Sequence, residues 1–413
     1  MANMHDYLRW RGDLSFAERP FNDADNVILA TFSYLDFTGI VPSEASGRSV
    51  SLKSACRKLI ESCGGDIAAS VRSLAKVDTR YVELIADSKR FGDAQLSAYA
   101  DMTDESRALQ FAAVTIELPK AGTYVSFRGT DSTLVGWRED FMLSFCVTEA
   151  QREAAGYLRR LLERQGRSGL PVRVGGHSKG GNLAEYAAVS CPDELRERIV
   201  CVYSNDGPGM APEVAECDGR ALLGRRFRHI VPSYSVVGML FAGKGEPRTI
   251  VRSTGAGIGQ HDPTTWQMLR GGLEEVAKLQ GECVTLNESI ARWAAGVPLE
   301  ERERVVDEVF DALESGGATR FDEIASSPES LQQVLRALGA TDERTRDLAM
   351  ALVEGTVNSS VEAVRKSTQE VFEGWRRGAR VLADDAARRL QGSSNDIRVP
   401  MHVIRAGNRS RRG

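Results

Sequence analysis

The chain has 413 residues, with 53 Lys and Arg against 57 Asp and Glu, which gives a formal net charge of −4 at pH 7. A chain of this length predicts two domains, or one large domain with an appendage. Its 42% hydrophobic and 27% charged residues exclude a mainly disordered or collagen-like chain. Because there is no basic excess, we expect no nucleic acid among its partners.

The sequence carries no recognisable targeting or anchoring signal. No run of about 18 apolar residues occurs, so no transmembrane segment is expected. The first residues lack the basic and apolar regions of a signal peptide. The seven cysteines form no C-x-x-C pair, which argues against a zinc site or a disulfide framework. These features predict a cytoplasmic protein with reduced, mostly buried thiols.

The N-terminal part predicts a helix followed by a β-meander. Apolar residues at 52–63 recur at i, i+3, i+4 and i+7, the pattern of a helix with one buried face. Three strand-like runs follow, at residues 96–100, 109–118 and 123–127. Residues 119–122 read P-K-A-G and are expected to turn the second run into the third.

Strands alternate with helices in the next part of the chain. A surface helix is expected over 149–164, where Ala and Leu fall on one side. A strand at 170–174, a helix at 180–189 and strands at 199–204 and 227–231 follow. This alternation after a meander predicts an α/β sheet that is mostly parallel in its second half.

The composition changes after Pro298, which predicts three parts. Residues 1–298 form the main domain, including the N-terminal helical segment, residues 299–391 form a helical region, and residues 392–413 form a basic, disordered tail. Within the helical region, apolar residues at 305–313 mark one amphipathic helix, and residues 357–375 carry a heptad seam interrupted by Thr368. This region is compatible with a membrane-surface or partner-docking role.

The candidate nucleophile is Ser178, within a G-x-S-x-G pattern formed with Gly176 and Gly180. A predicted strand precedes the pattern and a predicted helix follows it, which is the setting of a nucleophile elbow. Glycines suit such a strained turn because a Cβ there would collide with neighbouring atoms. A plain flexible turn is the alternative. A Walker A phosphate loop requires Gly-Lys-Ser/Thr, whereas the order here is Ser178-Lys179-Gly180.

A serine nucleophile needs a base, and elimination among the five histidines favours His261. The other four are His5 and His402 near the chain ends, His177 beside Ser178, and His229 in a predicted strand. His261 lies in a glycine-rich loop after the sheet strands, and the order Ser then His is that of α/β-hydrolases. An exposed loop histidine without a role is the alternative.

The acid that would orient His261 is ambiguous. Asp206 follows the predicted strand at 199–204 and is expected at the same sheet edge as Ser178, which makes it the preferred candidate. Asp262 adjoins His261 in sequence but would have to fold back on its neighbour's ring. An aspartate that caps a turn is the alternative reading of Asp206.

Two further motifs give the sequence a family resemblance. Residues 127–130 read F-R-G-T and residues 137–140 read W-R-E-D, similar to the F-R-G-[ST] and W-x-x-D motifs that precede G-H-S-x-G in class 3 lipases. With D-G-P-G at 206–209 and H-D-P-T-T-W at 261–266, the chain resembles a bacterial lipase-like family of largely unknown function. The resemblance covers roughly residues 1–390.

The resemblance implies an α/β-hydrolase fold and a serine hydrolase that cleaves carboxylic esters, lipid-like ones above all, through an acyl-enzyme on Ser178. It also implies that Thr130 and the backbone N–H of Lys179 donate hydrogen bonds to the oxyanion. The expected partner is an ester or lipid-like small molecule. Peripheral contact with a membrane is compatible with this expectation. No metal or organic cofactor is implied.

One departure from the class 3 pattern concerns the acid. Class 3 lipases carry it after the next strand, where this chain has Ser235, so the acid stays open between Asp206, Ser235 and Asp262. The rival interpretation is a non-catalytic protein that uses the hydrolase fold for binding or scaffolding. The missing acid at Ser235 favours the rival, and the G-x-S-x-G turn with two oxyanion elements favours the enzyme.

Overall fold

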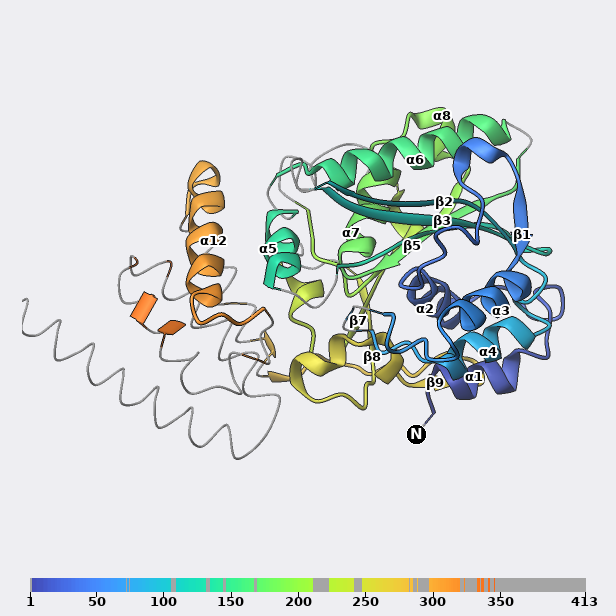
Figure 1. Cartoon of the computed structure of the whole chain (residues 1–413), viewed down its shortest axis with the longest axis horizontal. Coiled ribbons are helices and arrows are strands. Elements are labelled where there is room, and N and C mark those ends of the chain that lie inside the picture. The colour runs from blue at the N-terminus through green and yellow to red at the C-terminus, as the bar shows by residue number, and fades with distance from the viewer. Residues whose placement is uncertain are drawn as a thin grey trace, which may run out of the picture. The chain divides into compact units, whose positions relative to one another are not determined.

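An eight-stranded sheet forms the centre of the computed structural model (Figure 1). Its strands are β1 (Ser49–Ser51), β2 (Gln95–Asp104), β3 (Leu109–Leu118), β4 (Gly122–Phe127), β5 (Val172–His177), β6 (Ile199–Asn205), β7 (Phe227–Pro232) and β8 (Arg248–Val251). They lie side by side in the order in which they occur in the chain. Pairing is antiparallel from β1 to β4 and parallel from β4 to β8.

The residues that the structure describes all belong to one compact unit, residues 1–360. The structure describes residues 2–71, 73, 75–104, 109–130, 134–143, 146–166, 169–210, 223–240, 247–281, 283, 284, 288, 297–319, 323, 333, 334, 336, 337, 341 and 345. The predicted seam at 357–375 and the predicted tail at 392–413 lie outside these residues. Among the described helices, none has the length and apolar character needed to cross a membrane.

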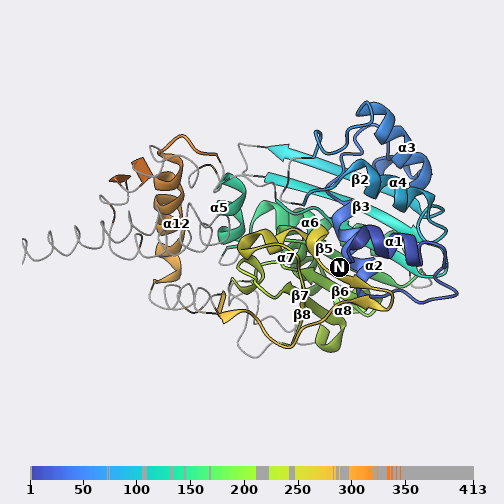
Figure 2. The same cartoon turned by 90° about the horizontal axis from the view of Figure 1, so that it is seen from below.

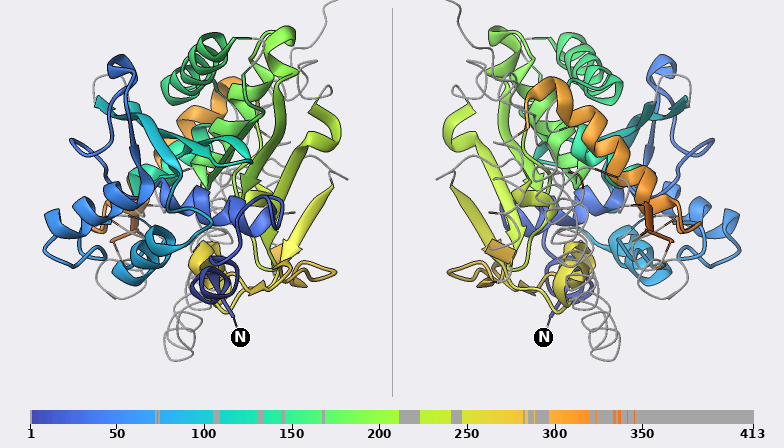
Figure 3. Two further views of the ribbon diagram at one scale, coloured as in Figure 1. Left: turned by 90° about the vertical axis from the view of Figure 1, so that its right-hand side faces the viewer. Right: turned by 90° about the vertical axis from the view of Figure 1, so that its left-hand side faces the viewer.

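Helices cover both faces of the sheet. The helices are α1 (Met4–Arg11), α2 (Asp23–Phe32), α3 (Leu52–Ser62), α4 (Thr79–Asp87), α5 (Leu134–Met142), α6 (Glu149–Gln165), α7 (Lys179–Val189), α8 (Asp193–Arg196) and α12 (Leu299–Glu314). One buried cluster joins α1 to α4 with one face of the strands, and another joins α6 and α7 with the opposite face. Figure 3 shows α6 and the N-terminal helices on opposite sides of the strands.

Local sequence explains the parallel strands and the helix that packs on them. Every residue of β4 is buried, as expected for a strand covered on both faces. The helix α6 begins at a capping box in which Thr148 and Gln151 satisfy each other's backbone N–H groups. Its Ala and Leu residues face the sheet, while its Arg and Glu residues face outward.

The observed architecture confirms the predicted α/β-hydrolase fold, with a sheet that is mostly parallel in its second half and is flanked by helices. The predicted strand at 170–174 begins only at Val172, because Pro171 has no N–H to donate to the sheet, and it continues to His177. The predicted amphipathic helix at 305–313 is confirmed as part of α12, which Figures 1 and 2 show beside α5.

Candidate active site

Ser178 occupies a closely packed turn between β5 and α7. Its φ of 55° and ψ of −131° lie in a region that non-glycine residues rarely adopt. A Cβ on Gly176 would lie 2.3 Å from the backbone carbonyl carbon of Gly180, and one on Gly180 would lie 2.2 Å from the carbonyl oxygen of Phe127. Both positions therefore require glycine, and the turn fixes the strained serine at the end of the strand.

The register of the parallel strands brings the predicted residues to one edge of the sheet. His177 in β5 pairs with Asn205 in β6, and Asn205 pairs with Ile230 in β7. Ser178 and Asp206 each follow directly after these strands, so both lie at the carboxyl ends of neighbouring parallel strands. In open α/β sheets this edge is where ligands bind.

Asp206 and His261 are in direct contact. Nδ1 of His261 lies 2.6 Å from Oδ2 of Asp206, a hydrogen bond in which the imidazole N–H donates. The other carboxylate oxygen accepts from the Ser235 hydroxyl and from the backbone N–H of Gly238 at 3.1 Å. Asp206 is fully buried, and a Cβ on Gly238 would lie 2.3 Å from it. A glycine at 238 thus permits the close approach that holds the carboxylate.

The other two candidate acids have different partners. The Asp262 carboxylate accepts hydrogen bonds from the backbone N–H of Thr264 at 2.9 Å and from its hydroxyl at 2.7 Å, which caps a short 3-10 helix. Ser235 contacts the carboxylate of Asp206. Of the three candidates, Asp206 is therefore the one whose side chain is hydrogen-bonded to the His261 ring in the described structure.

Among the described residues, no hydrogen bond joins the Ser178 hydroxyl to His261, whose ring contacts Asp206 and whose carbonyl oxygen contacts His177. The two residues are linked through His177, whose ring centroid lies 4.5 Å from that of His261. Because Asp206 occupies Nδ1 of His261, the imidazole nitrogen left for another partner is Nε2.

His177 has a structural role that sequence reasoning missed. The Tyr34 hydroxyl lies 2.8 Å from its Nδ1, and its Nε2 lies 2.7 Å from the backbone carbonyl oxygen of His261. Burial lowers the pKa of His177 well below its usual value, so the ring is neutral. A neutral imidazole has one donor and one acceptor, which fits Tyr34 donating to Nδ1 and Nε2–H donating to the His261 carbonyl. His177 thereby holds the His261 backbone in place.

The residues predicted as oxyanion donors, Thr130 and Lys179, both contact α5. The Thr130 hydroxyl lies 3.1 Å from Oδ1 of Asp140. The buried Lys179 ammonium donates to Oε2 of Glu139 at 2.7 Å and to the carbonyl oxygen of Gln110 at 2.7 Å. The consecutive acids of α5 thus hold the two residues that flank the expected oxyanion position.

A third α5 residue reaches the same site. Trp137 is buried, and its ring centroid lies 6.3 Å from that of His261. The signal for these contacts was present in the sequence as W-x-x-D, since residues three apart lie on the same face of a helix. The resemblance of W-R-E-D to a lipase motif associated these residues with the site but assigned no role to Asp140.

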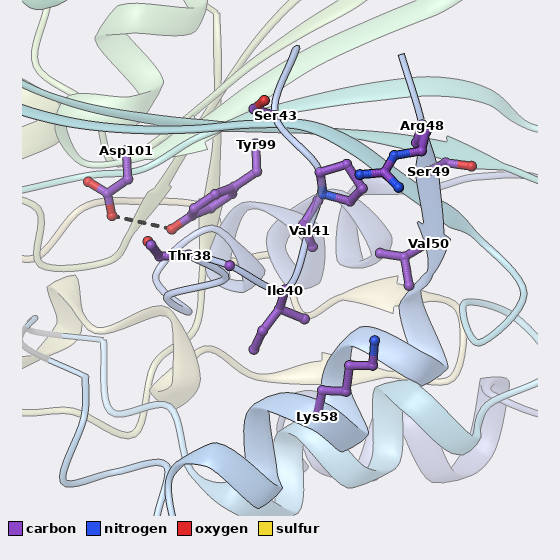
Figure 4. Close-up of a pocket in the computed structure, with 12 residues that line it drawn as sticks. Thr38, Ile40, Val41, Ser43, Arg48, Ser49, Val50, Lys58, Tyr99 and Asp101 are labelled. Carbon is purple, nitrogen blue, oxygen red and sulfur yellow. Dashed lines mark hydrogen bonds between the residues drawn. The ribbon is translucent and has the colours of Figure 1, made fainter. Parts of the chain in front are cut away.

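Two hollows in the described structure lie apart from the candidate catalytic residues. One, of about 670 Å³, lies between residues 38–43, β1 and α3, with Arg48 and Lys58 facing it and the Tyr99 hydroxyl 3.2 Å from Asp101 at one end (Figure 4). The other, of about 1100 Å³, borders α5, α12 and the start of α6. The residues predicted for the catalytic site line neither hollow.

Comparison with known proteins identifies the family. The model of the Mbeg1-like family matches residues 85–311, which is more than half of the chain. The chain belongs to the Mbeg1-like family. The predicted membership of a lipase-like family is confirmed, with the α/β-hydrolase sheet that such a family requires.

The matching solved structures have low sequence identity to this chain and low TM-scores. M37 lipase is 17% identical, with a TM-score of 0.32 over 53% of this chain and 69% of its own. A fungal lipase in complex with an inhibitor is 15% identical, with a TM-score of 0.30 over 55% of this chain and 77% of its own. Comparison with curated proteins gave no match.

Proposed function

We propose that this Mbeg1-like protein is a serine hydrolase that cleaves carboxylic esters, with Ser178 as nucleophile, His261 as base and Asp206 as the acid that orients the base. The observation that carries the proposal is the buried 2.6 Å contact between Asp206 and His261, at the sheet edge where the strained Ser178 turn lies. A buried acid–histidine pair at the same sheet edge as a serine held at such backbone angles supports a catalytic triad.

The proposed reaction forms and breaks an acyl-enzyme. His261 Nε2 takes the Ser178 hydroxyl proton while Oγ attacks the ester carbonyl carbon. The tetrahedral intermediate then expels the alcohol, which leaves with that proton, and an acyl group stays on Ser178. Water attacks this ester with the same base and releases the acid. Catalytic hydrogen bonds are often long before substrate binds, so the separate Ser178 hydroxyl is consistent with this sequence.

Two donors are proposed to stabilise the oxyanion. The backbone N–H of Lys179 lies in the first turn of α7, where N–H groups lack partners within the helix and the helix dipole favours negative charge. The Thr130 hydroxyl is proposed as the second donor. Such donors act where charge develops in the transition state.

A lipid-like substrate is supported by apolar surface next to α5. The hollow of about 1100 Å³ is lined in part by Leu109, Leu134, Met142 and Val147. Glu139, which holds Lys179, also lines it. An acyl chain is the chemical group that such a wall accommodates best.

We also propose a cytoplasmic location and a division of the chain into residues 1–298, 299–391 and 392–413. The cysteines within the described residues are free thiols, which fits a reducing compartment. In this division the main domain carries the whole proposed site. The helical region contributes α12, which packs on α5.

The decisive test is Ser178→Ala. We expect the substitution to abolish hydrolysis of p-nitrophenyl butyrate, by several orders of magnitude in kcat, and to abolish labelling by a fluorophosphonate probe. The thermal midpoint should stay nearly unchanged, because only one hydroxyl is lost. Equal hydrolysis by wild type and variant would contradict the enzyme and favour a hydrolase-fold scaffold.

A further inference from the structure

The contact between Thr130 and Asp140 poses a problem of proton supply. A threonine hydroxyl has one proton and two lone pairs, whereas an ionised carboxylate can only accept. The two oxygens lie 3.1 Å apart in a buried environment. If Asp140 is ionised, it takes the only proton of Thr130, and the hydroxyl then presents lone pairs to the oxyanion that it is expected to stabilise.

We propose that Asp140 works as a neutral carboxylic acid, which donates its own proton to Thr130 Oγ1 and thereby frees the Thr130 hydroxyl proton for the oxyanion. The inference rests on the proposed function, since it concerns the second oxyanion donor of that site. Asp140 is a positioning residue in this scheme, because it acts on the reaction through Thr130.

The surroundings of Asp140 favour its neutral form. Burial, with a smaller contribution from the neighbouring charge of Glu139, raises the pKa of its carboxyl, and all the surrounding groups together place this pKa at about 7. Lys179 and His261 act in the opposite direction, and so does the hydrogen bond with Thr130. The buried Tyr34 also interacts with the Asp140 charge. The site is thus balanced so that a modest added charge decides the state of Asp140.

The pairing of Lys179 limits its influence on Asp140. Its ammonium lies 2.7 Å from Glu139 and 2.7 Å from the Gln110 carbonyl oxygen, so the charge of Glu139 offsets part of the lowering effect of Lys179 on the pKa of Asp140. In this proposal the consecutive acids of α5 take different roles: Glu139 accepts the hydrogen bond from Lys179, and Asp140 in its neutral form donates to Thr130. The oxyanion places negative charge beside Thr130, which further disfavours an ionised Asp140.

The test compares Asp140→Asn with Asp140→Ala, measuring kcat and KM for p-nitrophenyl butyrate between pH 5.5 and 9. In the wild type we expect kcat to fall above about pH 7 as Asp140 ionises, toward the roughly 10²-fold loss typical of a missing oxyanion donor. The amide N–H of asparagine donates at every pH, so Asp140→Asn should keep kcat within about 5-fold and lose this alkaline fall. Asp140→Ala should lose roughly 10–10²-fold at every pH, with KM little changed.

Two controls isolate the proposed contact. Asp193→Asn makes the same chemical change on the exposed face of α8 and should leave the pH profile unaltered. Thr130→Val removes the hydroxyl on which Asp140 is proposed to act. It should therefore lower kcat and abolish the fall of kcat at alkaline pH, although Asp140 is still present. The Thr130→Val comparison uses wild-type Asp140, so it tests the proposal even if Asp140→Asn does not fold.

The outcomes separate this inference from the proposed function. If Asp140→Asn folds and is as inactive as Asp140→Ala, the neutral-acid role is wrong, although Ser178-dependent fluorophosphonate labelling of the wild type would still support the hydrolase. An alkaline fall that persists unchanged in Thr130→Val would also overturn it. A wild type that shows neither labelling nor hydrolysis would contradict the proposed function, and the inference with it.

Discussion

The Asp206 carboxylate accepts hydrogen bonds from three groups. The His261 ring, the Ser235 hydroxyl and the Gly238 N–H all point at it, and its backbone φ of 48° lies in the left-handed region. A strained residue persists only when its surroundings hold it. Ser235, at the position that the class 3 resemblance predicts for the acid, thus supports a carboxylate supplied by the preceding strand.

Three variants test this arrangement at the residue scale. Asp206→Asn should reduce kcat by roughly 10⁴, because an amide at this position favours the wrong imidazole tautomer. Ser235→Ala should cost less than about 10-fold, since two donors to Asp206 stay in place. Asp262→Asn should affect stability more than kcat, because Asp262 caps a 3-10 helix. Steady-state kinetics and thermal midpoints of the three proteins would check the order, and a larger kcat loss in Ser235→Ala than in Asp206→Asn would contradict it.

At the scale of elements, α5 is held from two directions. Its Glu139 and Asp140 contact the predicted oxyanion donors, whereas its Phe141 ring lies 5.8 Å from Phe310 of α12 in an edge-to-face arrangement. Arg138 is ion-paired with Asp311 of α12. The position of α5 at the site therefore depends on packing from a helix that follows it by more than 150 residues.

This dependence predicts the effect of Phe310→Ala. Removing a fully buried aromatic ring costs about 3–5 kcal/mol, and the cavity would lie against Phe141. We expect faster hydrogen exchange in the α5 amides and a lower kcat, because α5 carries Asp140. Phe310→Leu retains much of the apolar volume and should retain most of the protection. Unchanged exchange in α5 after Phe310→Ala would show that α12 does not hold it.

Local pattern predicted the elements better than their contacts. Apolar runs predicted β3 and β6, and the spacing of glycines about Ser178 predicted the strand–turn–helix junction. The roles of His177 and Asp140 could not be read in the same way, because each depends on a partner from a distant segment: the His261 carbonyl for one and Thr130, beyond the end of β4, for the other. Periodicity says which face of a helix is apolar, but not which loop approaches it.

At the scale of the whole molecule, the N-terminal helices form part of the site's support. The family match begins at residue 85, whereas α1, α2 and α3 precede it. Asn26 in α2 donates to the Asn205 side chain at 2.7 Å, and Asn205 donates to the carbonyl oxygen of Gly176 at 2.9 Å. Together with the contact between Tyr34 and His177, these bonds tie the N-terminal segment to the strand ends beside Ser178.

A buried ion pair between Asp25 and Arg90 holds α2 of the N-terminal segment in place. Arg90 donates to both carboxylate oxygens of Asp25, and both side chains are almost wholly inaccessible. Asp25→Ala would leave the buried guanidinium uncompensated, so we expect a loss of about 3–5 kcal/mol in the free energy of unfolding. Urea denaturation would measure it. Glu18→Ala, which breaks the exposed pair with Lys89, is the matched control and should change the midpoint little. Equal losses in the two variants would argue against a special role for the buried pair.

The strand order also bears on how the protein folds. Because β1 to β8 lie in the sheet in chain order, each strand pairs with the strand that precedes or follows it in the sequence. The turns from β2 to β3 and from β3 to β4 are a few residues long, and these short closures lower the entropic cost of forming the antiparallel pairs. The sheet can grow strand by strand as the ribosome releases the chain. The contact between Asp206 and His261 spans 55 residues, and His261 follows β8, so these two side chains meet late in synthesis.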